Sequence, residues 1–232
     1  MPLRKWLKST NFAIEGILQG AKTQRHLRYH FFSAAIVLFL SFLLGVTRME
    51  FVIISLAVML VITAEMLNSA VELVVDILSP EYSEKARVAK DIAAGAVLIS
   101  AFGAAVLGYI ILFPYLKMIF LNGFSIAKHS KEEIALIAVI LVLILVIITK
   151  SHFGKGHPLR GGMPSGHSAL AFSVWISVTY LTGNFLVSLL CLVLSVWIAQ
   201  SRVAVKAHNP WEVVLGGLMG AAVTFLLFRL FS

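Results

Sequence analysis

Seven apolar runs follow one another along this chain, and their lengths constrain the fold more than any other feature of the sequence. A helix needs about 20 residues to cross the hydrocarbon core of a bilayer. Charged residues make up 13% of the chain and hydrophobic residues 59%, so a single soluble core could not bury the apolar excess. The sequence therefore predicts an all-α integral membrane protein with about seven transmembrane helices. The predicted spans are residues 31–47, 51–71, 92–113, 133–149, 166–182, 185–200 and 212–229.

Basic residues predict how these spans are oriented. The net charge is +8, from 19 Lys and Arg against 11 Asp and Glu. With the N-terminus inside and seven crossings, 14 of the 19 basic residues fall on the inner side, as the positive-inside rule favours. Residues 114–124 are a candidate re-entrant or interfacial segment, and an additional crossing there would reverse the orientation of everything after it. The charge excess predicts contact with anionic head groups of a membrane and not with nucleic acid.

The N-terminal segment and the linker define the expected organisation. Residues 3–28 mix apolar and basic positions, which is typical of an amphipathic helix on the membrane surface. This segment has no apolar core before a cleavage site, so we expect it to be retained. The single cysteine, Cys191, excludes a disulfide framework. We predict a first module at 1–113, a linker at 114–132 and a second module at 133–232.

A stripe of polar residues crosses the second predicted span. Glu65, Asn68, Glu72 and Asp76 are spaced by three, four and four residues, so they share one face of a helix. Ionisable groups at membrane depth are costly and mark functional sites by default. Oxygen ligands at this spacing suit Mg²⁺, which binds one or two carboxylates plus substrate phosphates. The alternative is a helix that leaves the membrane with its later acids solvated.

Lys90 and Asp91 stand at the start of the next span, where the lysine can hold a phosphate or serve as an ordinary interface anchor. The stretches EMLNSAVELVVD and AKDIAAGAV together resemble the bacterial diacylglycerol kinase and undecaprenol kinase family, over roughly residues 10–113. The resemblance implies a surface helix, three spans and a homotrimer with composite sites. It also implies transfer of the ATP γ-phosphate to a lipid hydroxyl with Mg²⁺.

The same resemblance implies residue roles. Glu65 is the base for the lipid hydroxyl, Asn68 lies beside that hydroxyl, and Glu72 is a metal ligand. Gln24 stands where the family has a second metal-binding carboxylate, in Gln24-Arg25-His26 instead of Glu-Arg-Asn. The implied nucleotide contacts are Asp76, Tyr82, Lys90 and Asp91.

A second group of polar residues gathers at predicted helix ends in the C-terminal half. The stretches GGMPSGH and QSRVAVKAHNPWEVV lie on separate loops, and the number of predicted spans between them places both loops on the same membrane face. Cations around two histidines suit a phosphate site with a nucleophile and an acid, and the N-terminus of helix 166–182 favours an anion. The alternative is a set of interfacial histidines and positive-inside residues. The group comprises Lys150, Arg160, Ser165, His167, Arg202 and His208.

PSGH (164–167) and SRVAVKAHNPWE (201–212) resemble the type-2 phosphatidic acid phosphatase superfamily, over roughly residues 130–230. The resemblance makes His208 the nucleophile that forms a phosphohistidine and His167 the acid for the leaving oxygen. It implies no metal. Glu212 stands where an aspartate usually orients the nucleophile, and Arg160 replaces an arginine expected three residues earlier. The implied phosphate-binding residues are Lys150, Arg160, Ser165, Gly166 and Arg202.

Three functions are open at this stage. The first is a phosphatase for lipid phosphates or diphosphates, fused to an active lipid kinase in a bacterial inner membrane with both sites facing the cytoplasm. The second is the same phosphatase with the kinase-like module as a scaffold. The third is a transporter whose buried acids line an ion path, for which the two histidine loops need not converge.

Overall fold

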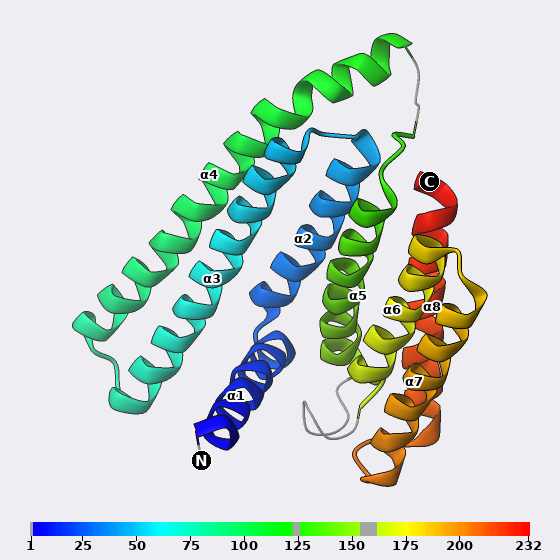
Figure 1. The fold of residues 1–232 in the computed structure, drawn as a ribbon. Helices are drawn as coiled ribbons and strands as arrows, with labels where there is room; N and C mark the ends of the chain where they lie inside the picture. The colour runs from blue at the N-terminus through cyan, green and yellow to red at the C-terminus, as the bar shows by residue number, and fades with distance from the viewer. Residues whose placement is uncertain (1, 123–125, 154–161) are drawn as a thin grey trace. The chain divides into compact units, whose positions relative to one another are not determined.

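Eight helices make up most of the chain in the computed structural model, which describes residues 2–122, 126–153 and 162–232, with side chains from Lys8 onward (Figure 1). They are α1 (Pro2–Thr23), α2 (Arg25–Leu44), α3 (Arg48–Leu78), α4 (Glu84–Asn122), α5 (Lys131–Phe153), α6 (Gly166–Thr182), α7 (Phe185–Ala204) and α8 (Pro210–Phe231).

The helices confirm an all-α membrane protein. Within the described ranges, six helices are long and apolar enough to cross a membrane by length and composition: α2, α3, α4, α5, α7 and α8. The remaining predicted span, 166–182, corresponds to α6, which has 17 residues. At 1.5 Å per residue α6 is about 26 Å long, slightly less than the hydrocarbon core of about 30 Å.

The chain divides into two compact units, and this division does not follow the order of the sequence. The N-terminal three-helix unit is Gln24–Ala127 and contains α2, α3 and α4. The C-terminal unit contains α5 to α8 and also α1, which packs against α5 and buries Leu18 and Ala21. The first helix of the chain is therefore part of the unit formed by its last hundred residues.

The predicted surface helix at 3–28 is too long. α1 ends at Thr23, and Gln24 has an extended backbone, with φ −95° and ψ 113°. Arg25 is the first residue of α2, a helix long and apolar enough to cross the membrane. The break at Gln24 also separates the two units.

The three-helix unit is built from two long neighbouring helices and a shorter one. α3 and α4 run side by side and make the most extensive contact in this unit (Figure 1). Thr47 caps α3 in a reciprocal capping box with Glu50, and the Tyr115 hydroxyl of α4 donates to the Glu50 carboxylate over 2.6 Å. α4 continues through Pro114 to Asn122, so most of the first half of the expected linker is helical.

In the C-terminal unit, α6 packs against α5, α7 and α8. Hydrogen bonds from buried side chains join these helices, as is common inside membranes. The hydroxyls of Ser173 (α6) and Thr224 (α8) are 2.7 Å apart, and both residues are fully buried. The Ser195 hydroxyl of α7 donates to the carbonyl of Ala171 in α6 over 2.9 Å.

Two glycines of α8 let its backbone approach α6 closely. A Cβ built at Gly216 would lie 2.4 Å from the carbonyl oxygen of Ser165, and one built at Gly220 would lie 1.9 Å from that of Ala169. The four-residue spacing places both glycines on one face of α8, in the small-xxx-small pattern of tightly packed membrane helices. This contact fixes the backbone of the PSGH segment against α8.

Gly220→Ala is expected to destabilise the protein by about 1–3 kcal/mol, because the added methyl forces the α6 and α8 backbones apart. The measurement is the thermal unfolding midpoint in detergent. Gly16→Ala is the matched control, since a Cβ at this helical glycine of the same unit meets no atom within 4 Å. Equal midpoints for the two variants would contradict the close-packing argument.

Candidate functional site

A short polar contact in the C-terminal unit joins His208 to Glu212. The Nδ1 atom of His208 lies 2.7 Å from the Glu212 carboxylate, and His208 is only 6% exposed. Pro210 occupies the first helical position of α8, and Asn209 caps the helix in a reciprocal capping box with Glu212. The four-residue spacing across the start of α8 therefore brings the imidazole to the carboxylate. Because the Glu212 carboxylate accepts a hydrogen bond from the Nδ1–H group, Nε2 is the nitrogen with a free lone pair.

Glu212 also holds the segment that contains the PSGH motif. Its carboxylate accepts from the backbone N–H of Gly162 over 3.1 Å, and its backbone carbonyl accepts from the N–H of Ser165 over 2.9 Å. Ser165 is fully buried at the N-terminal end of α6. A single residue thus connects the two motifs that the sequence places on separate loops.

Cations gather around the two histidines at this end of the unit. Lys150 is in the last turn of α5, and Arg202 is in the last turn of α7. Both charges act on His167 and on His208. The backbone carbonyl of Arg202 accepts from the N–H groups of Ala207 and His208, over 3.0 and 3.2 Å, which fixes the loop that carries His208.

Burial lowers the pKa of the His208 imidazole below its ordinary value near 6.5. The hydrogen bond to Glu212 acts in the opposite direction, and the charges of Lys150 and Arg202 lower the pKa further. The balance favours the neutral imidazole, which is the form that can act as a nucleophile.

A cavity of about 710 Å³ opens beside these residues. His167 and Arg202 line it together with the loop after α7. Its opposite wall comes from α1, a helix that the sequence analysis did not associate with this site. The lining residues are Lys8, Asn11, Phe12, Glu15, His167, Arg202, Val205, Lys206 and Ala207.

Arg160 and Gly166 are two further predicted phosphate-binding positions. Arg160 lies outside the described residues. Gly166 is the first residue of α6, and a Cβ there would lie 3.2 Å from a side-chain carbon of Val146. The backbone at this N-terminal end therefore packs closely against α5, and the amide of Gly166 stands at the positive end of the helix dipole.

In the three-helix unit, the predicted polar stripe lies along α3. Glu65 is 5% exposed and Asn68 is 8% exposed, so both are buried in the apolar part of a membrane helix. The amide nitrogen of Asn68 donates to the Glu72 carboxylate over 3.0 Å. The amide oxygen of Asn68 is buried without a hydrogen-bond partner in the described part of the chain. A buried acceptor of this kind suits a donor from outside, such as a lipid hydroxyl.

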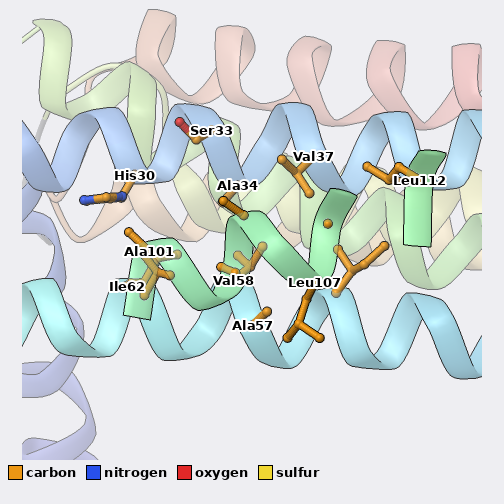
Figure 2. Close-up of a pocket in the computed structure, with 15 residues that line it drawn as sticks. His30, Ser33, Ala34, Val37, Ala57, Val58, Ile62, Ala101, Leu107 and Leu112 are labelled. Carbon is orange, nitrogen blue, oxygen red and sulfur yellow. The ribbon is translucent and has the colours of Figure 1, made fainter. Parts of the chain in front are cut away.

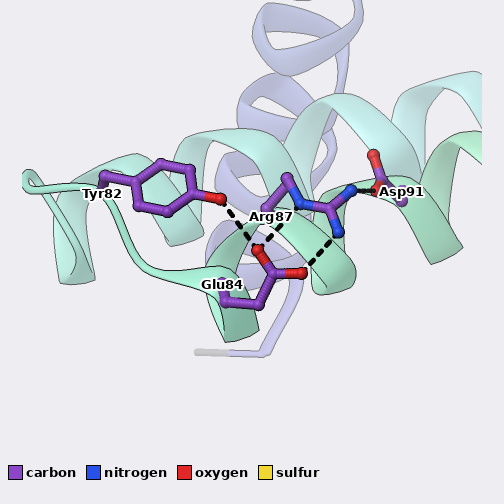
Figure 3. Close-up of polar contacts among 4 residues, drawn as sticks. All are labelled: Tyr82, Glu84, Arg87 and Asp91. Atoms are coloured by element: carbon purple, nitrogen blue, oxygen red, sulfur yellow. Dashed lines mark hydrogen bonds and ion pairs between the residues drawn. The ribbon is translucent and has the colours of Figure 1, made fainter.

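The other predicted contacts lie where α3 ends and α4 begins. Lys90 pairs with Asp76, joining α4 to α3. Arg87 bridges Glu84 and Asp91, and the Tyr82 hydroxyl donates to Glu84 over 2.8 Å (Figure 3). Glu84 and Arg87 were not predicted from the sequence as part of this group, although their spacing of three residues is typical of a helical ion pair.

Gln24 and Glu72 are the two positions predicted to hold a metal. Gln24 precedes α2, and its side chain makes no capping hydrogen bond. Among the described residues, no group of three His, Cys, Asp or Glu side chains could hold a metal ion. Glu72 fits as a single carboxylate ligand of Mg²⁺, an ion that takes its remaining ligands from phosphates and water.

The three-helix unit also contains a largely apolar pocket of about 390 Å³ between α2, α3 and α4 (Figure 2). Small side chains such as Ala34, Ala57 and Ala101 line it, and His30 is at one end in the view. Its lining is of the kind that accommodates an acyl chain or another apolar group.

Comparison with known proteins assigns each half of the chain to a family. The family model described as prokaryotic diacylglycerol kinase matches residues 11–112. An undecaprenol kinase of Bacillus subtilis (strain 168) is 35% identical over 114 residues, which are 49% of this chain and 93% of that protein. The chain belongs to the prokaryotic diacylglycerol kinase family. Residues 147–232 match the PAP2 superfamily, so the chain is a fusion of a kinase-family module and a PAP2 module, as the motifs predicted.

Two further relatives are both named diacylglycerol kinase. A diacylglycerol kinase of Synechocystis sp. is 38% identical over 122 residues, covering 49% of this chain and 70% of the relative. A diacylglycerol kinase of Haemophilus influenzae is 36% identical over 94 residues, covering 40% of this chain and 80% of the relative. No solved structure matches the chain.

Proposed function

We propose that this protein is a membrane lipid phosphatase that acts through a phosphohistidine and is fused to a lipid kinase module. The observation that carries the phosphatase proposal is the contact between His208 and Glu212 within a group of cations. The match of residues 147–232 to the PAP2 superfamily supports it. The substrate class is a phosphorylated membrane lipid, either a monophosphate or a diphosphate.

The first chemical step forms a bond between His208 and phosphorus. The Glu212 carboxylate accepts a hydrogen bond from the Nδ1–H of His208, which orients the ring and leaves Nε2 to attack the terminal phosphorus. The bond from phosphorus to the leaving oxygen breaks, and His167 gives that oxygen a proton. Lys150 and Arg202 stabilise the negative charge on the transferred phosphoryl group, together with Ser165 and the N-terminal amides of α6.

The second step returns the enzyme to its starting state. His167, now neutral, takes a proton from water, and the resulting hydroxide attacks the phosphohistidine. Inorganic phosphate leaves, and His208 regains its lone pair. We propose that Arg160 adds a further cation to this site, as the resemblance implies, and that these steps need no metal.

Glu212→Gln is expected to reduce the maximal rate of phosphate release by about 100- to 10,000-fold. A neutral amide orients the imidazole less well than a carboxylate and does not stabilise the positive charge that develops on the ring. The substitution should also shift the acid limb of the pH profile. The wild-type limb lies below pH 6.5, because the pKa of His208 is lowered. Glu212 raises that pKa, so its removal moves the limb to still lower pH. Phosphate release from a lipid monophosphate, in detergent with a chelator present, provides both readouts.

The control for this experiment is Glu132→Gln, which removes an exposed acid from the first turn of α5 in the same unit. This variant should keep both the rate and the pH profile. A limb that moved to higher pH in Glu212→Gln would contradict the proposed role of the carboxylate.

A second activity is proposed for the kinase-family module, on the strength of the buried acceptor of Asn68 next to Glu65. Glu65 takes the proton of a lipid hydroxyl, and the Asn68 amide oxygen accepts that hydroxyl's hydrogen bond before transfer. The proposed lipid is diacylglycerol or undecaprenol. The B. subtilis relative is named for undecaprenol and the Synechocystis relative for diacylglycerol.

The nucleotide contacts in this proposal are Asp76, Tyr82, Lys90 and Asp91, which the hydrogen-bond pairs already gather at the ends of α3 and α4. ATP is the phosphoryl donor, and Mg²⁺ when bound neutralises charge on its phosphates. Glu72 would hold that ion, with Gln24 contributing a neutral oxygen. When the nucleotide binds, the Lys90 ammonium leaves Asp76 and pairs with a phosphate of the nucleotide.

Two other functions were open from the sequence. A phosphatase with the kinase-family module as a scaffold differs from the main proposal only in kinase activity, which is measured as ATP-dependent phosphorylation of diacylglycerol or undecaprenol. A transporter does not require the histidine loops to converge, yet Lys150, Arg202 and His208 all act on His167. That clustering favours an enzyme.

Assembly and placement complete the proposal. The module boundaries are 1–113, 114–132 and 133–232. α4 has no buried residue within the described part, so it is available to contact lipid or another copy, and we propose a homotrimer through the kinase-family module.

We place the protein in a bacterial inner membrane with both sites on the cytoplasmic face. Labelling of a cysteine introduced at Ser151 from outside intact cells would overturn that placement.

A further inference from the structure

The phosphatase cavity has a wall that the PAP2 match does not include. Residues 147–232 account for His167, Arg202 and the loop after α7. The opposite wall is α1, which contributes Lys8, Asn11, Phe12 and Glu15. The spacings of three, one and three residues keep these side chains on one face of the helix.

α1 is held at this place by its own packing. Leu18 and Ala21 are 9% and 1% exposed, and α1 contacts α5, the helix that has Lys150 in its last turn. α1 also belongs to the same compact unit as α5 to α8. The α1 wall and the helices that carry the two histidines therefore belong to one packed unit.

The charges on the cavity wall are unevenly distributed. Lys8 and Glu15 are seven residues apart, so they are separated by about 10 Å along the helix axis. Lys206 adds a second cation from the loop after α7. Both lysines are exposed, and neither of them is among the residues assigned above to hold the transferred phosphate.

We propose that α1 forms the outer headgroup wall of the phosphatase site, where Lys8 and Lys206 bind the second anionic group of a lipid diphosphate. Asn11, one turn from Lys8, donates its amide to the same group. This inference rests on the phosphatase function proposed above and specifies its substrate class. The terminal phosphate occupies the His208 site, while the inner phosphate lies toward Lys8, and the lipid monophosphate leaves after cleavage.

The volume of the cavity fits a headgroup larger than one phosphate. At about 710 Å³ it lies within the range of about 300–1,000 Å³ that is usual for small-molecule sites. A single phosphate would leave the α1 side of this space to water. A diphosphate extends from the histidines toward α1 and meets cations at both ends.

The test compares two soluble probes with the same short isoprenoid chain, farnesyl diphosphate and farnesyl monophosphate, on the full-length protein in detergent. Wild-type protein should prefer the diphosphate. Lys8→Gln should reduce kcat/KM for the diphosphate by about 10-fold and change the value for the monophosphate by less than about two-fold. Lys8→Arg should retain most of the preference.

Lys22→Gln is the matched control, because Lys22 is a lysine of the same helix that does not line the cavity. It should leave both substrates unaffected. Equal losses for the two substrates in Lys8→Gln, no loss for either, or a wild-type preference for the monophosphate would overturn the inference. If the wild type releases phosphate from neither substrate, the proposed phosphatase function itself fails.

Discussion

His208→Ala is expected to reduce phosphate release from lipid phosphates by at least about 1,000-fold, the scale on which loss of a nucleophile reduces turnover. The substitution removes the nitrogen that is proposed to attack phosphorus, while Glu212, Lys150 and Arg202 stay in place. Substrate binding should therefore change far less than the rate. The measurement is phosphate release by the purified full-length protein.

A second readout separates a lost nucleophile from a damaged site. Rapid quenching of the wild type with a substrate labelled in its terminal phosphate should trap label on the protein, in a bond that survives alkali. His208→Ala should trap none. His208→Gln, which keeps a polar group next to Glu212, should behave in the same way.

The control is His152→Ala. His152 is an exposed histidine in the last turn of α5 whose ring meets Phe153 edge to face, and it has no proposed role. It should keep full activity. Retention of most activity by both His208 variants, at an unchanged unfolding midpoint, would exclude the phosphohistidine mechanism.

The convergence of the two histidine motifs follows from simple properties of membrane helices. Apolar runs predict where helices begin and end, and the number of crossings predicts which ends share a side. These rules place Lys150, His167, Arg202 and His208 together before any packing is known, and the structure brings them to one end of the C-terminal unit. The functional roles of these residues stay predictions.

The role of α1 could not be predicted in this way. The pattern of α1 indicates an amphipathic helix, and its match to the kinase family begins at residue 11. Its partner is α5, more than a hundred residues later, and this pairing depends on the shapes of side chains such as Leu18 and Ala21. Composition and periodicity carry no information about such a distant contact. The break at Gln24 was equally unexpected, because neither glycine nor proline marks it.

The close contact of α6 with α8 shows another limit of sequence patterns. Gly216 and Gly220 lie within a long apolar run, and glycines in such runs do not all contact a neighbouring helix. Only the geometry distinguishes Gly220, whose added Cβ would overlap Ala169, from Gly103 and Gly108 of α4, which face open space.

Glu65→Gln is expected to reduce lipid phosphorylation by at least about 100-fold, the usual contribution of a general base. The assay uses protein that also carries His208→Ala, so that the phosphatase cannot remove the product. Purified protein is incubated with ATP, Mg²⁺ and either diacylglycerol or undecaprenol, and the phosphorylated lipid is measured by mass spectrometry. Glu81→Gln, which changes an exposed acid of the same unit, should have no effect.

The His208→Ala protein itself decides between the two remaining functions. Product that depends on Glu65 means that Gln24 is tolerated at the metal position and that the protein catalyses two opposite reactions on one class of lipid. In that case Gln24→Glu should increase the rate, because a carboxylate is a stronger Mg²⁺ ligand than an amide oxygen. If neither protein forms product while the wild type releases phosphate, the kinase-family module serves as a scaffold. The buried carboxylate of Glu65 would then lack a catalytic role, and Glu65→Gln should leave phosphate release unchanged.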